Sequence, residues 1–143
     1  MVDVDALDAG RRFAAALDAE DYEAAGECLA ADCAYHSRTG PLIGPTAIVA
    51  SYQGIGDAAR GQLDAIDYTS EVEAAGPREA VVEFIDKLQH AGRRHVYRCR
   101  QLIRVDERGL IVKLTHQELP GERERLEEFL AGVVAEGARK FEE

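Results

Sequence analysis

The stretch of residues 93–118 constrains the fold more than any other part of this sequence. Apolar or small polar residues alternate with charged residues over 93–105 and again over 110–118. An alternation with a period of two places the two kinds of residue on opposite faces of a β-strand. Asp106-Glu107-Arg108-Gly109 lies between the two runs and predicts a turn, because Asp and Gly favour turns. The stretch therefore predicts a β-hairpin.

The two faces of this hairpin differ in chemistry. The first strand is expected to point these side chains to the interior: His95, Tyr97, Cys99, Gln101 and Ile103. Its outer face carries a row of arginines, Arg94, Arg98, Arg100 and Arg104. In the second strand the expected interior residues are Val112, Leu114 and His116, with Ile111, Lys113, Thr115 and Gln117 on the outer face. A sheet with this pattern has an interior that is lined partly by polar groups.

Helices are expected before and after the sheet. Asp3 or Asp5 can cap a first helix, Asp21 a second over residues 22–30, and Pro45 favours the start of a third. The third helix is expected to bury Ile48, Val49, Tyr52 and Ile55. After Pro120-Gly121 a last helix presents an apolar stripe of Leu126, Phe129, Leu130, Val133 and Val134.

Further strands are expected between these helices. Residues 33–38 predict a short strand that ends at Thr39-Gly40-Pro41, and residues 66–74 and 79–90 predict longer ones. The interior face of the last of these strands carries Val82, Phe84, Asp86 and Leu88. Helices first, long antiparallel strands next and a closing helix predict a single α+β domain over residues 1–143.

Composition narrows the classes of function. The net charge of −10 opposes binding to nucleic-acid phosphates, so no nucleic-acid partner is expected. No apolar run approaches the roughly 20 residues of a membrane-spanning helix. The first residues do not resemble a signal peptide, and the three cysteines form no CxxC pair. We therefore expect a cytoplasmic protein that has no membrane partner.

Motifs for metals and cofactors are not evident. Cys28, Cys33 and His36 have a spacing that resembles a metal site, but they cross the junction between a predicted helix and a predicted strand. No Gly-rich phosphate loop is present in the sequence. The expected protein therefore binds neither a metal nor a cofactor.

Four segments, residues 13–21, 29–36, 44–48 and 109–113, carry a resemblance to a known family. They resemble the NTF2-like superfamily and, within it, the SnoaL-like branch of polyketide cyclase-like proteins. The resemblance covers about residues 6–120. It implies a cone-shaped α+β fold in which a curved, mostly antiparallel sheet wraps around N-terminal helices and encloses a pocket. One fold of this kind hosts many functions, so the site must be argued residue by residue.

The resemblance argues against one activity of the superfamily. Ketosteroid isomerases use a tyrosine and two aspartates at the positions of Phe13, Ser37 and Gln101. Neither the base nor the acid is present here, so we do not expect ketosteroid isomerase activity.

The catalytic residues of other activities in the superfamily are retained here only in part. Epoxide hydrolases of this fold use an arginine and two aspartates at the positions of Phe84, Asp86 and His116, of which only Asp86 is retained. SnoaL-like cyclases place an acid–base aspartate at the position of His116. Histidine keeps the capacity for proton transfer.

We therefore expect His116 to be the principal proton-transfer residue and Asp86 to act with it in the same cavity. A nearby ionised Asp86 would raise the pKa of His116, whereas burial alone would lower it. The residues expected to line the ligand pocket are Phe13, Tyr35, Ser37, Ile48, Tyr52, Phe84, His95, Tyr97, Gln101 and Leu114.

The same residues also have structural interpretations. Asp86 can form a buried hydrogen bond to Tyr97 or to the backbone, and His116 can be a solvated histidine at a strand end. One hypothesis is a cofactor-independent acid–base enzyme, a cyclase, isomerase, dehydratase or hydrolase, acting on a small apolar oxygenated molecule. The alternative is a non-catalytic ligand-binding or accessory protein. A protein–protein adaptor is a third hypothesis, for which the sequence indicates no partner.

The outer face of the sheet predicts a homodimer. It combines apolar side chains, Val96, Leu102, Ile85 and Ile111, with the charged side chains of Arg98, Arg100 and Lys113. An apolar centre with a charged border is typical of an interface. The arginines are also expected to pair across strands with Glu71, Glu73, Glu79 and Glu83.

Overall fold

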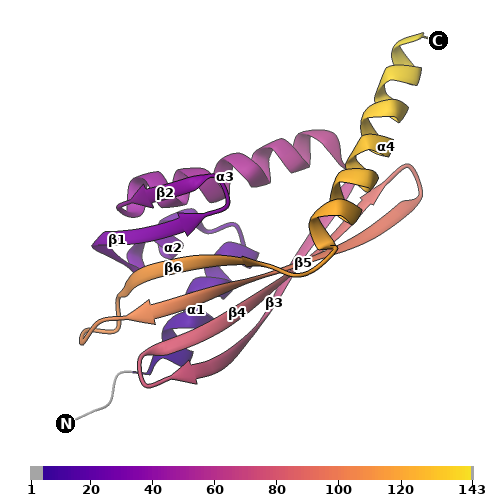
Figure 1. Ribbon diagram of the computed structural model, residues 1–143. Helices are drawn as coiled ribbons and strands as arrows, with labels where there is room; N and C mark the ends of the chain where they lie inside the picture. The colour runs from indigo at the N-terminus through magenta and orange to yellow at the C-terminus, as the bar shows by residue number, and fades with distance from the viewer. Residues whose placement is uncertain (1–4, 143) are drawn as a thin grey trace.

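Four helices and six strands make up the computed structural model, which describes the backbone of residues 5–142 and the side chains of residues 5–133 (Figure 1). In chain order they are α1 Ala6–Asp18, α2 Tyr22–Glu27, β1 Leu29–Ser37, β2 Gly40–Ile43, α3 Pro45–Gln62, β3 Ala65–Gly76, β4 Glu79–His90, β5 Arg93–Val105, β6 Ile111–Glu118 and α4 Glu122–Glu142. The order confirms the expected α+β class.

All six strands belong to one sheet with the order β2-β1-β6-β5-β4-β3. Only the pair β1–β6 is parallel, and the other pairs are antiparallel. The sheet is strongly twisted, α1 to α3 lie together on one side of it, and α4 extends beyond one end (Figure 1). The concave side of the sheet is therefore closed by helices from the N-terminal part of the chain.

The helices begin at the residues that can cap them. The Asp5 carboxylate accepts hydrogen bonds from the backbone N–H groups of Leu7 and Asp8, and the Asp21 carboxylate accepts one from Ala24. Pro45 is the first residue of α3, where its missing N–H is not needed. These starts confirm the sequence analysis. Asp3 lies outside the described residues, as does the side chain of Val134.

Helix α3 differs from the expectation in its buried face. Ile55 is 71% exposed, although the sequence pattern assigned it to the interior. The buried residue in this turn is Gly56, which lies close to the hydroxyl groups of Tyr22 and Tyr68. The buried face of α3 therefore continues from Tyr52 through Gly56, four residues further on, and leaves Ile55 in solvent.

The main core lies between α1 and the concave side of the sheet. Phe13 is completely buried, and Ala9 and Ala14 beside it are almost completely buried. A Cβ atom on Gly10 would lie 3.0 Å from Cγ1 of Val72 in β3. Small residues on α1 therefore allow the helix backbone to approach the sheet closely. A second cluster joins Leu63 and Leu88 to Val133, in the middle of α4.

Two features of the sheet were not expected from the sequence. Residues 40–43, for which no strand was expected, pair with β1 as the edge strand β2. In β6, Ile111 pairs with Val105 while Lys113 pairs with Arg104, so Val112 is an extra residue in a β-bulge. The bulge turns Ile111 into the core, where it is completely buried, and the expected outward position of Ile111 is wrong.

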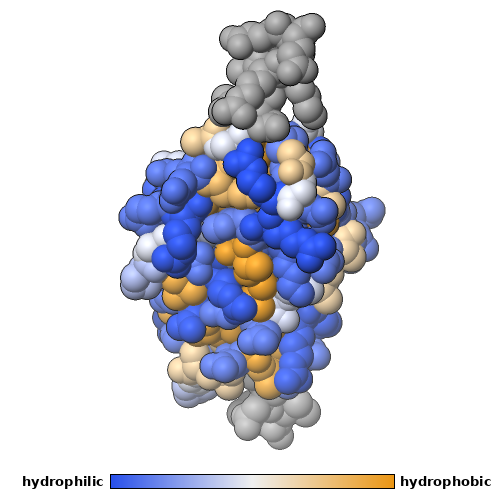
Figure 2. All heavy atoms as spheres, turned by 90° about the vertical axis from the view of Figure 1, so that its right-hand side faces the viewer, coloured by the Kyte–Doolittle hydropathy of each residue, from blue (hydrophilic) through white to orange (hydrophobic). Residues whose placement is uncertain are grey.

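The bulge also changes the outer face of the sheet. Of its expected apolar centre, Ile111 is in the core and Ile85 is only 8% exposed, whereas Val96 is 44% exposed. Elsewhere, apolar residues reach the surface in patches between hydrophilic ones, as on the face shown in Figure 2. The apolar part of the outer face is therefore smaller than the sequence indicated.

Glycines in two helices predict opposite effects of adding a side chain. Gly54 is exposed within α3, and a Cβ atom added there would have no other atom within 4 Å. We expect Gly54→Ala to stabilise the fold by about 0.5–1 kcal/mol, because alanine restricts the unfolded chain. Gly10→Val should destabilise it by about 1–3 kcal/mol, because valine overpacks the contact with Val72. Urea unfolding of both variants measures the two changes, and equal signs would contradict the helix packing described here.

Candidate functional site

The strand pairing places the polar interior residues in rows across the concave side of the sheet. Asp86 in β4 lies opposite Tyr68 in β3 and opposite Tyr97 in β5. Two rows further along β5, Gln101 lies opposite His116 in β6. Directly opposed residues of antiparallel strands point to the same face, so both rows face the helices. The expected interior orientation of Asp86, Tyr97, Gln101 and His116 is therefore the one that the pairing produces.

Asp86 is a largely buried carboxyl group. Burial raises its pKa to about 7, and the negative charge of Asp18 contributes to this increase. Asp18, at the end of α1, accepts a 2.6 Å hydrogen bond from the hydroxyl group of Ser70. Among the described residues Asp86 itself has no hydrogen bond or ion pair to a side chain. It therefore changes its protonation state near neutral pH without a partner that fixes its charge.

A hydrogen-bonded set of three side chains occupies the interior between α3, β1 and β5. Gln101 is 3% exposed; its amide nitrogen donates to the Tyr35 hydroxyl at 3.1 Å, and its amide oxygen accepts from the Tyr52 hydroxyl at 2.5 Å. The rings of Tyr35 and Tyr52 are stacked with centroids 5.4 Å apart. Phe13 meets the edge of this stack at Tyr52. These contacts connect three of the expected pocket residues to one another and fix their orientation.

A charged cluster surrounds His116 at the end of β6. Both ring nitrogens of His116 are buried and have no hydrogen-bond partner among the described residues. Glu118 Oε1 lies 3.8 Å from Nε2 of His116, too far for a hydrogen bond. The same oxygen lies 3.2 Å from Nη2 of Arg123 and 3.7 Å from Nε of Arg38. Arg123, in α4, also lies over the ring of Tyr97 and donates to its hydroxyl at 3.4 Å.

The structure separates the two residues that we expected to act as a pair. Asp86 and His116 lie on strands that flank β5, four residues apart in register, which puts their Cα atoms roughly 16 Å apart. Burial lowers the pKa of His116, and the acidic group that opposes this change is Glu118. The expectation that Asp86 raises the pKa of His116 is therefore corrected: the acid that acts on His116 comes from its own strand.

The other expected pocket residues lie in three different environments: the core, a turn between two strands, and a contact with the last helix. Phe13, Ile48 and Leu114 are completely buried in the core, and Phe84 packs against it. The hydroxyl of Ser37 donates to the carbonyl of Gly40 in the β1–β2 turn, so it serves the turn. His95 stacks on Phe129 of α4, with ring centroids 5.2 Å apart, so it holds the last helix against β5.

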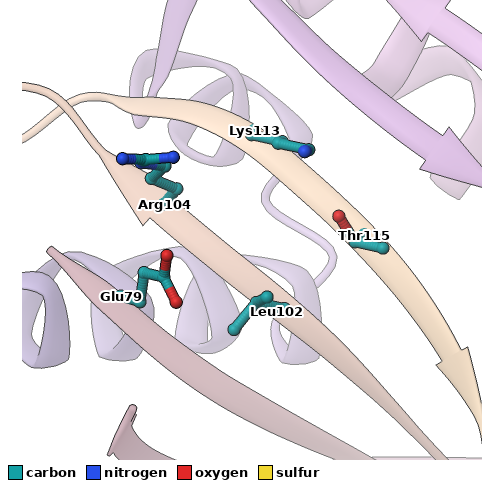
Figure 3. Close-up of a pocket in the computed structure, with 5 residues that line it drawn as sticks. All are labelled: Glu79, Leu102, Arg104, Lys113 and Thr115. Atoms are coloured by element: carbon teal, nitrogen blue, oxygen red, sulfur yellow. The ribbon is translucent and has the colours of Figure 1, made fainter. Parts of the chain in front are cut away.

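Two surface hollows lie away from this interior. One, of about 50 Å³, is on the outer face of the sheet and is lined by Glu79, Leu102, Arg104, Lys113 and Thr115 (Figure 3). The other, of about 370 Å³, lies between α1, α2 and the β5–β6 turn and is lined by Ala9, Arg12, Ala24, Glu27, Cys28, Arg108, Gly109 and Leu110. Neither includes an expected pocket residue. The enclosed pocket expected on the concave side therefore stays a prediction; Phe13, Ile48 and Leu114, three of its expected residues, are completely buried.

Sequence reasoning missed four residues that act at this site. Asp18 and Tyr68 face Asp86, and Glu118 and Arg123 surround His116. The alternation of residues in β3 did indicate Tyr68, because Tyr68 shares its parity with the interior residues of that strand. Asp18 and Arg123 come from helices whose packing angle the sequence pattern does not specify. Glu118 has the interior parity of His116 but lies at a strand end.

The described part of the chain contains neither a metal-binding cluster nor a membrane-spanning helix. No group of three or more His, Cys, Asp or Glu side chains there is arranged to hold a metal ion. The cysteines at positions 28, 33 and 99 are free thiols. In the same part of the chain, no helix combines the length and apolar character needed to cross a membrane.

Comparison with solved structures identifies the fold. The chain is similar to a candidate polyketide cyclase from Xanthomonas campestris pv. campestris, with a TM-score of 0.66 and 19% identity over 90% of this chain and 96% of that one. It is also similar to an LEH-like epoxide hydrolase from Mycobacterium tuberculosis (TM-score 0.61, 18% identity, 91% and 95% covered). A third similar structure is a Mycobacterium tuberculosis protein in complex with estradiol-17β-hemisuccinate (TM-score 0.59, 20% identity, 82% and 95% covered). The fold is therefore the NTF2-like α+β fold, as expected.

The family follows from the sequence match. The family model of the SnoaL-like domain matches residues 10–114. The chain belongs to the SnoaL-like domain family, which confirms the resemblance seen in its segments. No curated protein matches the chain.

The raised pKa of Asp86 predicts a pH dependence of stability. The folded protein holds the proton up to about pH 7, whereas the unfolded chain loses it near the ordinary value of 3.8. The free energy of unfolding should therefore fall as pH rises between these values, by about 1.4 kcal/mol for each pKa unit of difference. In Asp86→Asn this fall should be absent. The exposed Glu71→Gln serves as the control, and the same pH dependence in both variants would contradict the buried carboxyl.

Proposed function

We propose that this protein is a cofactor-independent acid–base enzyme that acts on a small, apolar, oxygenated molecule bound on the concave side of the sheet. The reaction would be a cyclisation, isomerisation, dehydration or hydrolysis. The observation that carries the proposal is Asp86, a largely buried carboxyl group between Tyr68 and Tyr97 on the concave face, whose pKa burial raises to about 7. Such a value suits general acid–base catalysis near neutral pH.

Two proton-transfer groups are available in this proposal. Asp86 exchanges a proton near pH 7, and His116, whose pKa burial lowers, is neutral at that pH and can accept a proton. Because the two lie in different rows of the sheet, they would act on different parts of one substrate. An oxygen at one end and a C–H bond at the other would meet separate groups.

Hydroxyl groups near Asp86 support the same function. Burial raises the pKa of Tyr68 and of Tyr97 to about 12, and the charge of Asp86 adds to both increases. Both phenols therefore remain protonated at neutral pH and can donate to a carbonyl oxygen of the ligand. Gln101 and Tyr52 would position the apolar part of the ligand.

Exchange of a carbon-bound proton tests the catalytic role. We expect the protein to speed the exchange of the α-protons of 1-tetralone, an apolar bicyclic ketone, for deuterium in D₂O, followed by ¹H NMR. Asp86→Asn or His116→Gln should slow the protein-dependent rate by about 10²-fold or more. The rate should change with a midpoint near pH 7, where Asp86 titrates. Glu71→Gln is the matched control and should keep the wild-type rate.

The alternative function is non-catalytic ligand binding or an accessory role. The observation in its favour is the mutual hydrogen bonding of Tyr35, Gln101 and Tyr52, which leaves these groups satisfied without a substrate. One of the similar structures contains estradiol-17β-hemisuccinate, so the fold accepts an apolar polycyclic ligand in that protein. Binding of 1-tetralone, seen as ¹⁵N–¹H shifts, with exchange at the buffer rate would favour this alternative.

A homodimer through the outer face of the sheet is also proposed. Glu83 already pairs with Arg98 at 3.1 Å and with Arg100 at 3.0 Å, as expected for cross-strand pairs. These pairs border Val96, an exposed apolar side chain of the same face. Lys113 lies further along the same face, opposite Arg104, at the hollow of Figure 3.

Light scattering tests the dimer. At micromolar concentration the mass should be about twice 15.6 kDa. Val96→Asp should return the mass to that of the monomer, because it places a charge in the centre of the interface. Ile43→Asp changes another exposed apolar residue, on the edge strand β2, and should leave the dimer intact. A wild-type monomer would end the proposal.

A further inference from the structure

His116 is the most conspicuous unexplained group in the described structure. Its side chain is 12% exposed, and neither ring nitrogen has a hydrogen-bond partner within residues 5–133. Buried polar atoms in folded proteins nearly always have a partner, so two orphaned nitrogens on one ring need an explanation. The groups around them are Arg38, Glu118 and Arg123.

We propose that His116, Arg38 and Arg123 form a recognition site for an anionic oxygen group, of the carboxylate type, on the ligand. The proposal rests on the proposed function in one respect, namely that a ligand binds on the concave side of the sheet. It adds the chemical class of that ligand: an apolar body that carries a carboxylate.

The first argument is the number of unused donors. Arg123 uses Nε and Nη2 for Glu118 and Nη2 for Tyr97, which leaves the N–H groups of Nη1 without a partner in the described structure. Arg38 reaches Glu118 only at 3.7 Å and is half exposed. Both guanidinium groups therefore keep donors for a further oxyanion. Charged N–H donors form strong hydrogen bonds to carboxylate oxygens, and Arg123 can offer those of Nη1.

The second argument is the local charge. The two arginines carry two positive charges against the single charge of Glu118, while His116 is neutral near pH 7 because burial lowers its pKa. The chain as a whole has a net charge of −10. A local positive excess on such a protein attracts an anion to this point. A bound carboxylate would also supply the acceptor that a ring N–H of His116 lacks.

The third argument is the position of the cluster. His116 lies opposite Gln101, and Glu118 lies opposite Cys99, so both side chains continue the rows of the concave face. Arg123 covers the ring of Tyr97 from α4. An anionic group held here places the apolar body of the ligand toward Tyr97 and Asp86.

Two isosteric probes test this inference. 2-Naphthylacetate and 2-naphthylacetamide have the same shape and differ in charge. Isothermal titration should give a Kd at least about tenfold lower for the carboxylate, as expected for a charge-assisted contact. Arg123→Gln should reduce this preference to about twofold or less while the Kd of the amide stays within about twofold. Arg125→Gln, an exposed arginine of the same helix, should keep the wild-type preference.

The outcomes separate this inference from the proposed function. The ¹⁵N shifts of the His116 ring should move with the carboxylate and not with the amide. If the amide binds as tightly as the carboxylate, or if the preference survives in an Arg38→Gln/Arg123→Gln variant, this inference is overturned and the proposed function stands. If neither probe binds, both fail. Arg123→Gln must keep the wild-type melting temperature within a few degrees for its loss of preference to count, and Arg123→Lys should restore part of the preference.

Discussion

The close approach of α1 to the concave side of the sheet determines how the rest of this structure is arranged. Alanine and glycine on the buried side of α1 let its backbone come near β3, and Phe13 then fills the space between sheet and helix. A larger residue at Gly10 would push the helix away from the sheet. The C-terminal end of the same helix brings Asp18 to Ser70 and toward Asp86. One packing contact therefore sets both the core and the electrostatic environment of the candidate site.

The site that results is extended. At one end of the site, a second carboxyl group and two phenols lie around Asp86. At the other end, arginines and a glutamate lie around His116. The hydrogen-bonded set of Gln101, Tyr35 and Tyr52 adjoins the second end. A low-dielectric interior shifts the pKa of the carboxyl group up and that of the imidazole down, because burial favours the uncharged form of each group. Both shifts reduce the number of charges in the interior.

The sequence predicted the parts of this structure that follow from local periodicity. The alternation in β4 and β5 correctly indicated that Asp86, Tyr97 and Gln101 share the concave face, and Asp5 and Asp21 cap their helices as expected. The sequence did not predict how far apart side chains on different strands lie. The alternation of residues gives the face of the sheet on which a side chain lies, but it does not give its position along the neighbouring strand. The coupling of Asp86 to His116 failed for this reason. Arg123 was missed because its place depends on how α4 docks, through contacts such as the stacking of Phe129 on His95.

The bulge at Val112 determines which side chains of the last strand face the interior. Upstream of Val112 the odd residue Ile111 faces the core, and downstream the even residues Leu114 and His116 do. A regular strand that kept both Val112 and the inward position of Ile111 would exchange the faces of everything that follows. Thr115 and Gln117 would then line the interior, and the imidazole would face solvent. Deletion of Val112 alone would keep His116 inside, because Ile111, Lys113 and Leu114 would then alternate regularly.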